Sequence, residues 1–279
     1  IYQDPNILFL TGLNQEKVAL VFNHENNAIH LFLPLANPNK EFWEGAFMGV
    51  SDHNQRLLCE QFHVTAVHDY AQLFKVIHHE LTINNRSDIA TFWYEPQDNQ
   101  KQLTDCHWTF KTALENFLHQ QGVSFSLKNC ESLLADRVIL DEIDQANIAH
   151  ANALTEAVFE QTCAQLLSCK NETHVAGILK GAIYQKTWCG QSFPAIVASG
   201  KNAAVLHYTK NNDPLEAHSL LLLDFGCKYQ SMMSDVSRTI PVNGTFNPLQ
   251  ALLYTIVLEA QLHVEAAVKP GVTIEVLNA

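Results

Sequence analysis

The stretch LLLLDFGCKYQSMMSDVSRTIPV, residues 220–242, constrains the fold of this chain more than any other feature. Its four consecutive leucines, followed by Asp224, are typical of a buried strand. The polar segment KYQS separates this run from a second strand-like run that begins near Asp235. Two such runs joined by a short polar turn indicate a β-hairpin with a carboxylate on each strand.

The spacing of the two aspartates permits them to be neighbours. A hairpin centred between Tyr229 and Gln230 places Asp224 directly opposite Asp235, where Cβ atoms lie roughly 4.5–5.5 Å apart. Two carboxylates this close repel, so one keeps a proton or both bind a cation. A divalent metal ion satisfies both carboxylates. Two solvated or turn-capping aspartates would have the same spacing, so the residues alone leave both interpretations open.

A histidine stands in a second informative stretch, FPAIVASGKNAAVLHYTKN, residues 193–211. The strand-like AIVASG leads into a loop with Gly200 and Asn202, and His207 follows between apolar neighbours. A histidine there can donate a hydrogen bond to a developing oxyanion or transfer a proton. A hydrogen-bonded histidine inside the core would give the same pattern, so this alternative also stays open.

Composition narrows the class of partner. Seventeen Lys and Arg against 29 Asp and Glu give a net charge of −12, which argues against nucleic acid and anionic membranes as partners. No apolar run approaches the roughly 18 residues that span a bilayer. The seven cysteines include no CxxC pair, so we expect no disulfide framework and a reducing, cytoplasmic location.

Short apolar runs alternate with helix-like patterns over the first part of the chain, which is typical of a compact α/β domain. We expect strands at NILFL (6–10), VALVF (18–22), AIHLFLP (28–34) and ATFWY (90–94), and helices at 70–81 and 107–122. We place the domain boundary after residue 130, so that residues 1–130 form the first domain and residues 131–279 the second.

Two long helices are expected in the second domain. The first contains DEIDQANIAHANALTEAVF (141–159), in which apolar residues recur at three- and four-residue spacing: Ile143, Ala146, Ala149, Ala153 and Ala157. The other runs over about 248–269, with Asn247 as N-cap and Pro248 at the first position. Its predicted buried stripe is Leu249, Leu252, Leu253, Ile256, Val257, Ala260 and Val264. The last residues, VTIEVLNA, are expected to open another helix.

The segments at residues 193–211 and 220–242 resemble the pita-bread metallopeptidases. This family includes methionine aminopeptidase, prolidase, creatinase and aminopeptidase P, and the two segments resemble aminopeptidase P most. YTIVLEAQ and KPGVTI continue this similarity, and DRVILDEIDQANIAHANAL resembles the start of the family's catalytic domain. Upstream, LFLTGLNQEKVALVF and EFWEGAFMG resemble its non-catalytic N-terminal domain. The resemblance implies an α/β N-terminal domain of the creatinase/aminopeptidase P type, followed by a partial α+β pita-bread domain.

The resemblance also implies a chemistry. Asp224 and Asp235 would be the first two ligands of a dinuclear metal centre, usually manganese in this subfamily, and His207 the catalytic histidine. The substrate would be a peptide with proline at the second position. A hydroxide activated by the two metal ions would hydrolyse the bond before that proline. The family further suggests a homo-oligomer.

The chain departs from the family pattern at both ends. It has no initiator Met and no signal-peptide pattern, and nothing after KPGVTI resembles the family's later His and two Glu ligands. We therefore expect a part of a longer enzyme or a natural half-protein, inactive by itself because two carboxylates supply too few ligands. Prolidase, which acts on dipeptides, and a non-catalytic pita-bread module that binds peptide or protein are the alternatives.

Overall fold

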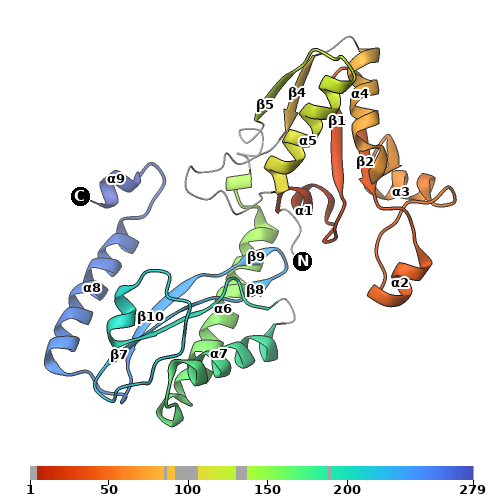
Figure 1. The fold of residues 1–279 in the computed structure, drawn as a ribbon. Coiled ribbons are helices and arrows are strands. Elements are labelled where there is room, and N and C mark those ends of the chain that lie inside the picture. The colour runs from red at the N-terminus through yellow and green to blue at the C-terminus, as the bar shows by residue number, and fades with distance from the viewer. Residues whose placement is uncertain (1–4, 85–86, 92–105, 130–136, 188–189, 279) are drawn as a thin grey trace. The chain divides into compact units, whose positions relative to one another are not determined.

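The computed structural model describes residues 5–84, 87–91, 106–129, 137–187 and 190–278. The chain divides into two compact units, residues 1–139 and 140–279 (Figure 1). The predicted domain boundary after residue 130 lies outside the described residues.

Unit 1 is built on a three-stranded sheet of order β1-β2-β3. Strand β2 (Ala28–Leu33) pairs antiparallel with β1 (Ala19–Asn23) and parallel with β3 (Ala66–Asp69). A second, two-stranded parallel sheet joins β4 (Asp88–Thr91) to β5 (Ser126–Asn129). The strands predicted at 18–22 and 28–34 are thus confirmed.

Strand β2 supplies side chains to two separate clusters of the core of unit 1. Leu31 and Leu33 pack in one cluster, and Phe32 packs in the other with helices α4 (Leu73–Ile83) and α5 (Cys106–Gln120). This alternation is what a strand buried on both faces produces. The helices of unit 1 are α1 (Pro5–Thr11), α2 (Pro38–Glu44), α3 (Gln55–Phe62), α4 (Leu73–Ile83), preceded by a 3₁₀ turn at Tyr70–Gln72, and α5 (Cys106–Gln120). Helices α4 and α5 confirm the two predicted at 70–81 and 107–122.

The segment NILFL forms helix α1, so the prediction of a strand at 6–10 was wrong. Pro5 suits the first position of a helix because its missing N–H has no partner there anyway. Gly12, at φ +70°, ends the helix and donates its N–H to Leu8 O at 2.7 Å. These two end signals outweigh the apolar run between them. The strand predicted at 90–94 is confirmed to Thr91, and its last three residues lie outside the described ones.

Unit 2 contains an antiparallel sheet of order β10-β7-β6. Strand β7 (Leu220–Phe225) lies between β6 (Ile196–Ser199) and β10 (Val236–Pro241). The end of the β7–β10 hairpin forms the short pair β8 (Lys228–Tyr229) and β9 (Met232–Met233). The helical segments of unit 2 are α6 (Glu142–Cys163), η3 (Leu166–Ser168), α7 (Glu172–Lys186), η4 (Gly200–Ala204), α8 (Pro248–Ala267) and α9 (Ile274–Leu277).

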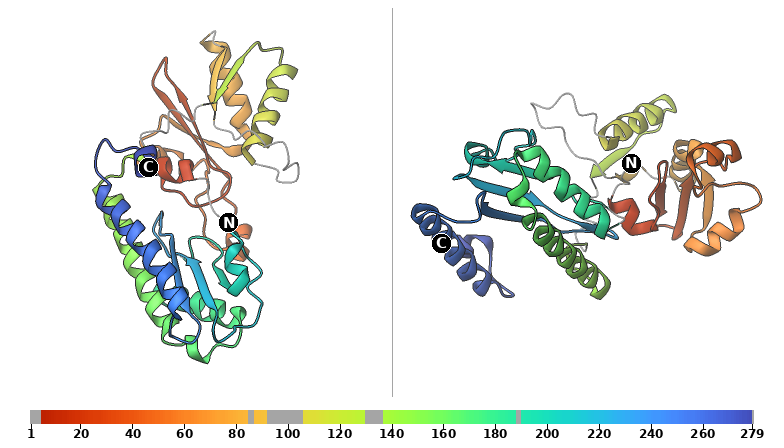
Figure 2. Two further views of the ribbon diagram at one scale, coloured as in Figure 1. Left: turned by 90° about the vertical axis from the view of Figure 1, so that its left-hand side faces the viewer. Right: turned by 90° about the horizontal axis from the view of Figure 1, so that it is seen from below.

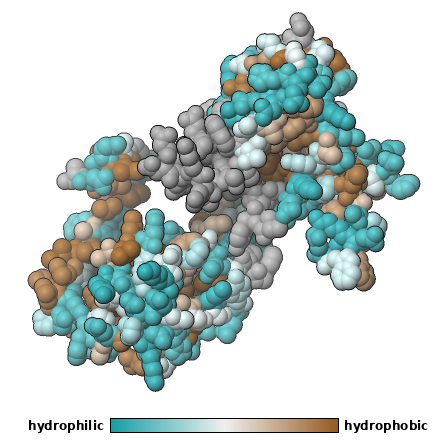
Figure 3. All heavy atoms as spheres, in the orientation of Figure 1, coloured by the Kyte–Doolittle hydropathy of each residue, from teal (hydrophilic) through white to brown (hydrophobic). Residues whose placement is uncertain are grey.

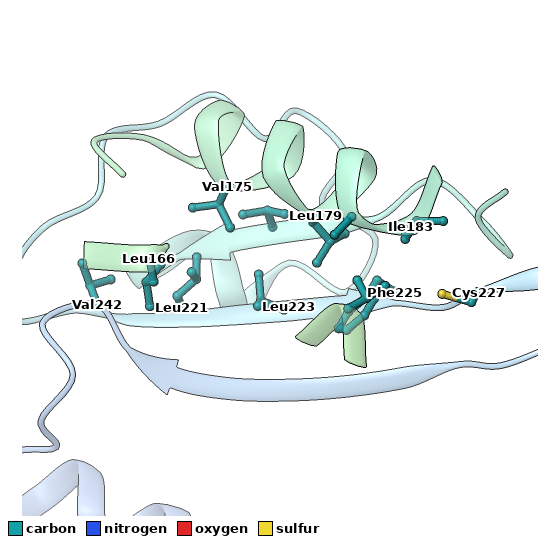
Figure 4. Close-up of a cluster of buried hydrophobic side chains, with 12 residues drawn as sticks. Leu166, Val175, Leu179, Ile183, Leu221, Leu223, Phe225, Cys227 and Val242 are labelled. Atoms are coloured by element: carbon teal, nitrogen blue, oxygen red, sulfur yellow. The ribbon is translucent and has the colours of Figure 1, made fainter. Parts of the chain in front are cut away.

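The side chains of strand β7 point in turn to the two faces of this sheet. Leu221, Leu223 and Phe225 are fully buried and point toward helix α7 (Figure 4). Each buried leucine contributes about 1.5–3 kcal/mol through the hydrophobic effect. Helices α6 and α7 pack against each other (Figure 2) and both contribute to this core. Because side chains alternate along a strand, Leu222 and Asp224 lie on the opposite face.

Helix α6 is confirmed, but the apolar residues whose spacing predicted it are not the residues that it buries. Ile143 is 70% exposed, and the buried residues are instead Ala151, Thr155, Val158 and Thr162. Thr155 and Thr162 donate their hydroxyl groups to the carbonyls of Ala151 and Val158 at 2.9 and 2.8 Å. A threonine satisfied in this way can be buried, so a pattern of apolar residues alone missed the true stripe.

Helix α8 is also confirmed, with the expected start. Asn247 Oδ1 accepts from Gln250 N at 2.9 Å, and Gln250 Oε1 accepts from Asn247 N at 3.0 Å, which completes a capping box. The prediction that its apolar stripe is buried was wrong, because none of its residues is buried within the described part of the chain. Figure 3 shows an apolar band over α8, to which Leu249, Leu252, Leu253, Ile256, Val257, Leu262 and Val264 belong.

The last helix predicted in unit 2 is also present, because α9 confirms the helix expected in VTIEVLNA. Among the described helices, none combines the length and the apolar character that crossing a bilayer requires.

Candidate metal centre on the β7–β10 hairpin

The hairpin pairs in a register different from the predicted one. Ser237, not Asp235, lies opposite Asp224, and Tyr229 lies opposite Met232. The prediction that the two aspartates face each other directly was therefore wrong by two residues. The turn is centred between Gln230 and Ser231, one residue later than expected, and Gln230 adopts a left-handed conformation there with φ of +50°.

The two aspartates nevertheless share one face of the hairpin. A register shift of two residues leaves every side chain on its original face, whereas a shift of one would reverse it. Asp235 precedes Ser237 by two positions, so it lies diagonally across from Asp224 on the same side. Desolvation and the neighbouring negative charge of Asp224 raise the pKa of the Asp235 carboxyl. The two aspartates are therefore diagonal neighbours on one face of the hairpin, and their role as metal ligands stays a prediction.

Asp224 is held on both sides because it stands on the central strand. Ser237 Oγ donates a hydrogen bond to Asp224 Oδ1 at 3.0 Å from the β10 side. On the β6 side, Ile196 lies opposite Asp224. The aspartate is half-buried between these neighbours, so its carboxylate has a fixed direction.

Close to its turn, the hairpin is bonded to helix α6 through buried hydroxyl groups. Ser234 Oγ lies 2.5 Å from Thr155 Oγ1 and accepts from Cys227 N at 2.9 Å. Gly226 allows this close approach, because a Cβ atom there would lie 1.8 Å from the Ser234 carbonyl oxygen. Ser234 immediately precedes Asp235, so these contacts also fix where the second carboxylate leaves the hairpin.

His207 lies on an exposed turn that follows η4, so it is not a core histidine. Its neighbour Tyr208 is buried against Ile196, Ala198 and Leu222. Because Leu222 and Asp224 share a face of β7, Tyr208 anchors the His207 turn to the face that carries Asp224. The described contacts join His207 to neither aspartate, and its catalytic role stays a prediction.

The residues on this face fit part of a metal site. Carboxylate oxygens are the ligands that hard divalent cations prefer, and two neighbouring carboxylates gain most from a shared cation. Within the described residues, no group of three or more His, Cys, Asp or Glu side chains forms a complete metal site. Two carboxylates would supply only part of a metal site, and the assignment of Asp224 and Asp235 as ligands stays a prediction.

Sequence reasoning missed one buried carboxylate near this face. Glu172, at the start of α7, is fully buried and bonded to the segment that carries His207. An acidic residue in the first turn of a helix is ordinarily explained by the helix dipole, so its sequence position gave no sign of burial.

Two protein-family models match this chain. Residues 146–279 match metallopeptidase family M24, and residues 2–90 match the aminopeptidase P N-terminal domain. The first match includes His207, Asp224 and Asp235, and the second includes the β1-β2-β3 sheet. The two matches lie in different units of the structure.

Curated relatives carry the name Xaa-Pro aminopeptidase. "Probable Xaa-Pro aminopeptidase pepP" of Pyrenophora tritici-repentis is 28% identical over 264 residues, which cover 95% of this chain and 52% of the relative. A relative from Chaetomium globosum is 37% identical over 145 residues, covering 52% of this chain and 24% of its own length. Where a curated relative aligns with nearly the whole of this chain, the chain spans about half of that relative's length.

Solved structures give the same fold. Escherichia coli aminopeptidase P in complex with substrate matches with a TM-score of 0.80 and 22% identity, over 100% of this chain and 62% of that chain. Pseudomonas aeruginosa aminopeptidase PepP matches with a TM-score of 0.79 and 21% identity, over 97% of this chain and 60% of that chain. The predicted fold class is confirmed. Residues 146–279 are thus assigned to metallopeptidase family M24, and residues 2–90 to the N-terminal domain of the aminopeptidase P type.

Proposed function

We propose that the protein is a Xaa-Pro aminopeptidase, which hydrolyses the bond between an N-terminal residue and a proline at the second position. The observation that carries the proposal is the placement of Asp224 and Asp235 as diagonal neighbours on the face of the sheet away from α7. Relatives named Xaa-Pro aminopeptidase, aligned over most of the chain, support the choice of substrate.

Asp224 and Asp235 are proposed to hold divalent metal, with two ions and manganese as the expected composition. A bound divalent cation supplies Lewis-acid polarisation of the substrate carbonyl and lowers the pKa of water. Ser237 orients Asp224 through its 3.0 Å hydrogen bond. The hydroxyl groups of Ser234 and Thr155 fix the strand that delivers Asp235.

His207 is proposed to act on the substrate. An exposed imidazole can donate a hydrogen bond to the scissile carbonyl oxygen, and this bond strengthens as negative charge develops on that oxygen. The buried Tyr208 ring keeps the adjacent histidine on the Asp224 face of the sheet.

Two further properties are proposed with this function. A cytoplasmic location is supported by the free thiols of Cys59, Cys163, Cys169 and Cys227. A homo-oligomer is expected from the family resemblance, and light scattering coupled to size-exclusion chromatography tests it.

The experiment uses the complete gene product, stripped of metal and titrated with manganese. Three substrates are compared: a Xaa-Pro dipeptide, a longer Xaa-Pro peptide and the same peptide with alanine in place of proline. We expect metal-dependent cleavage of the longer Xaa-Pro peptide only before its proline. Asp224→Asn and Asp235→Asn should each lower kcat/KM at least 100-fold and release metal, whereas Asp144→Asn on helix α6 should retain both.

Other outcomes point to the alternatives. Cleavage of the dipeptide alone would identify a prolidase. A protein that binds no metal and stays inactive with added manganese would be a peptide- or protein-binding module. Residues 1–279 expressed alone should turn over no substrate, because two carboxylates supply too few ligands to a metal centre.

A further inference from the structure

The carboxylate of Glu172 is fully buried and accepts hydrogen bonds on both oxygens. Oε1 accepts from Ser199 N at 2.7 Å, from Ser199 Oγ at 2.9 Å and from Asn202 Nδ2 at 3.0 Å. Oε2 accepts from Tyr208 OH at 2.8 Å and from Asp213 N at 2.9 Å. Two backbone and three side-chain donors thus converge on one acceptor group.

These donors keep the carboxylate ionised in spite of its burial. Desolvation raises the pKa of Glu172, but the hydrogen bonds from Asn202, Ser199, Asp213 and Tyr208 outweigh it, so the pKa is lowered overall. Glu172 also stands in the first turn of α7, where the helix dipole favours negative charge. An ionised carboxylate is an acceptor only, so every neighbouring group must present a donor to it.

All five donors belong to one segment, residues 199–213, which also contains His207. A second anchor fastens the far end of this segment. Asn211, at φ +47°, accepts from Val197 N at 2.8 Å and donates to Ala195 O at 2.9 Å. Between the anchors, Leu206 and His207 remain exposed while Tyr208 is tied down.

The bond from Tyr208 is the most direct link between this anchor and the proposed catalytic residue. Tyr208 packs its ring on Ile196, Ala198 and Leu222 and donates its hydroxyl to Glu172. The packing and the hydrogen bond therefore hold the ring in one position, and the backbone of His207 is fixed next to it. A displacement of about 1 Å at a reacting group can cost on the order of 100-fold in rate.

We propose that Glu172 is a positioning residue that holds His207 on the Asp224 face of the sheet, acting through Tyr208. The inference rests on the proposed function for the role of His207. The alternative is that Glu172 serves only the stability of unit 2.

Two conservative variants separate these roles, because each removes one hydroxyl donor from the same carboxylate. Tyr208→Phe keeps the ring packing but cuts the link beside His207. Ser199→Ala removes the other hydroxyl and leaves Ser199 N bonded to Glu172. If Glu172 positions His207, Tyr208→Phe lowers kcat for the Xaa-Pro peptide by about tenfold or more, whereas Ser199→Ala lowers it by about threefold at most.

A second measurement does not depend on activity. The His207 imidazole is observed by NMR in histidine-labelled protein and assigned by its loss in His207→Gln. We expect one sharp ring signal in the native protein and in Ser199→Ala, and a shifted or broadened signal in Tyr208→Phe. Where the Glu172→Gln protein folds, its His207 signal should also be shifted or broadened. The new amide NH2 group would face the N–H and O–H groups that donate to the native carboxylate, so some of these hydrogen bonds would be lost.

The two readouts also distinguish failure of this inference from failure of the proposed function. A Tyr208→Phe protein with native His207 signals and native kcat would overturn the inference, as would an equal loss of kcat in Ser199→Ala. If the native protein hydrolyses no Xaa-Pro peptide, the proposed function fails. The His207 signals then decide by themselves whether Glu172 positions that ring.

Discussion

Ser237 on β10 lies directly opposite Asp224 on β7 and donates its hydroxyl to Asp224 Oδ1 at 3.0 Å. A hydrogen bond to a metal-binding carboxylate orients it toward the ion and leaves its other oxygen free. The partner of Asp224 across the hairpin is thus a donor, while the second carboxylate approaches along the diagonal.

Replacement of Ser237 by alanine should weaken metal binding more than it weakens the fold. We expect manganese affinity to fall about tenfold, because partners of metal ligands typically contribute 10–100-fold. The free energy of unfolding should change by no more than about 0.5 kcal/mol, since Ser237 is exposed. Calorimetric titration with manganese and denaturant unfolding measure the two effects. Ser168→Ala, which removes an exposed hydroxyl elsewhere in unit 2, serves as the control, and an unchanged affinity in Ser237→Ala would contradict the assignment.

Replacement of Asp235 by asparagine should have opposite effects with and without metal. In metal-free protein the substitution removes the repulsion from Asp224, so we expect an unchanged or slightly higher melting temperature. Added manganese should raise the melting temperature of the native protein and leave that of Asp235→Asn unchanged, because binding to the folded state alone stabilises it. Equal stabilisation of both proteins by manganese would rule out Asp235 as a ligand.

Replacement of Gly226 by alanine should disrupt the hairpin near its turn. The new Cβ would lie 1.8 Å from the Ser234 carbonyl oxygen, so the backbone must move. We expect a loss of about 3 kcal/mol or more in the free energy of unfolding, measured by denaturant titration. Gly181→Ala in helix α7 is the matched control. Its Cβ would meet nothing within 4 Å, so it should stabilise the protein by roughly 0.5–1 kcal/mol. Similar stabilities for the two variants would show that Ser234 can move aside.

Unit 1 should lose stability as the pH falls below about 6.5. His68 Nε2 lies 3.0 Å from His30 Nδ1, and desolvation and His30 lower the pKa of His68 while Glu80 raises it less. The unfolded chain therefore binds a proton at higher pH than the folded one does. The stabilising contribution is complete above the unfolded pKa and is lost as pH falls through the folded pKa.

Hydrogen exchange of β2 amides, corrected for the intrinsic pH effect, measures this loss. His68→Gln should flatten the pH dependence, while the exposed His24→Gln should keep the native slope. An unaltered slope in His68→Gln would assign the pH effect to another group.

The sequence predicted those features of unit 2 that depend on neighbouring residues. Asn247 and Pro248 marked the start of α8 because capping acts within one helical turn. The strands around Asp224 and Asp235 were also predicted, but their register was not. Gln230 takes a left-handed conformation that sequence rules reserve for Gly, Asn or Asp, so the turn carried no recognisable signal.

The remaining errors arose where tertiary contacts decide. Thr155 and Thr162 are buried because their hydroxyl groups bond within α6, and a count of apolar residues places such threonines outside the stripe. Glu172 is buried because five donors from residues 199–213 surround it, and none of them adjoins it in the chain. Periodicity shows which side chains a helix could bury, but not which groups another segment will bring to it.

The anchor of the His207 segment has a consequence for how this centre is inherited. The described partners of the Glu172 carboxylate lie 27 to 41 positions away in the chain, and Ser237 lies 13 positions from Asp224. One uninterrupted stretch of the sequence, residues 172–237, therefore contains Asp224, Asp235, His207 and Glu172. Extended back to Thr155, this stretch also includes the helix α6 hydroxyl that bonds to Ser234, so a single recombination cassette of residues 155–237 would carry these side chains together with their supports.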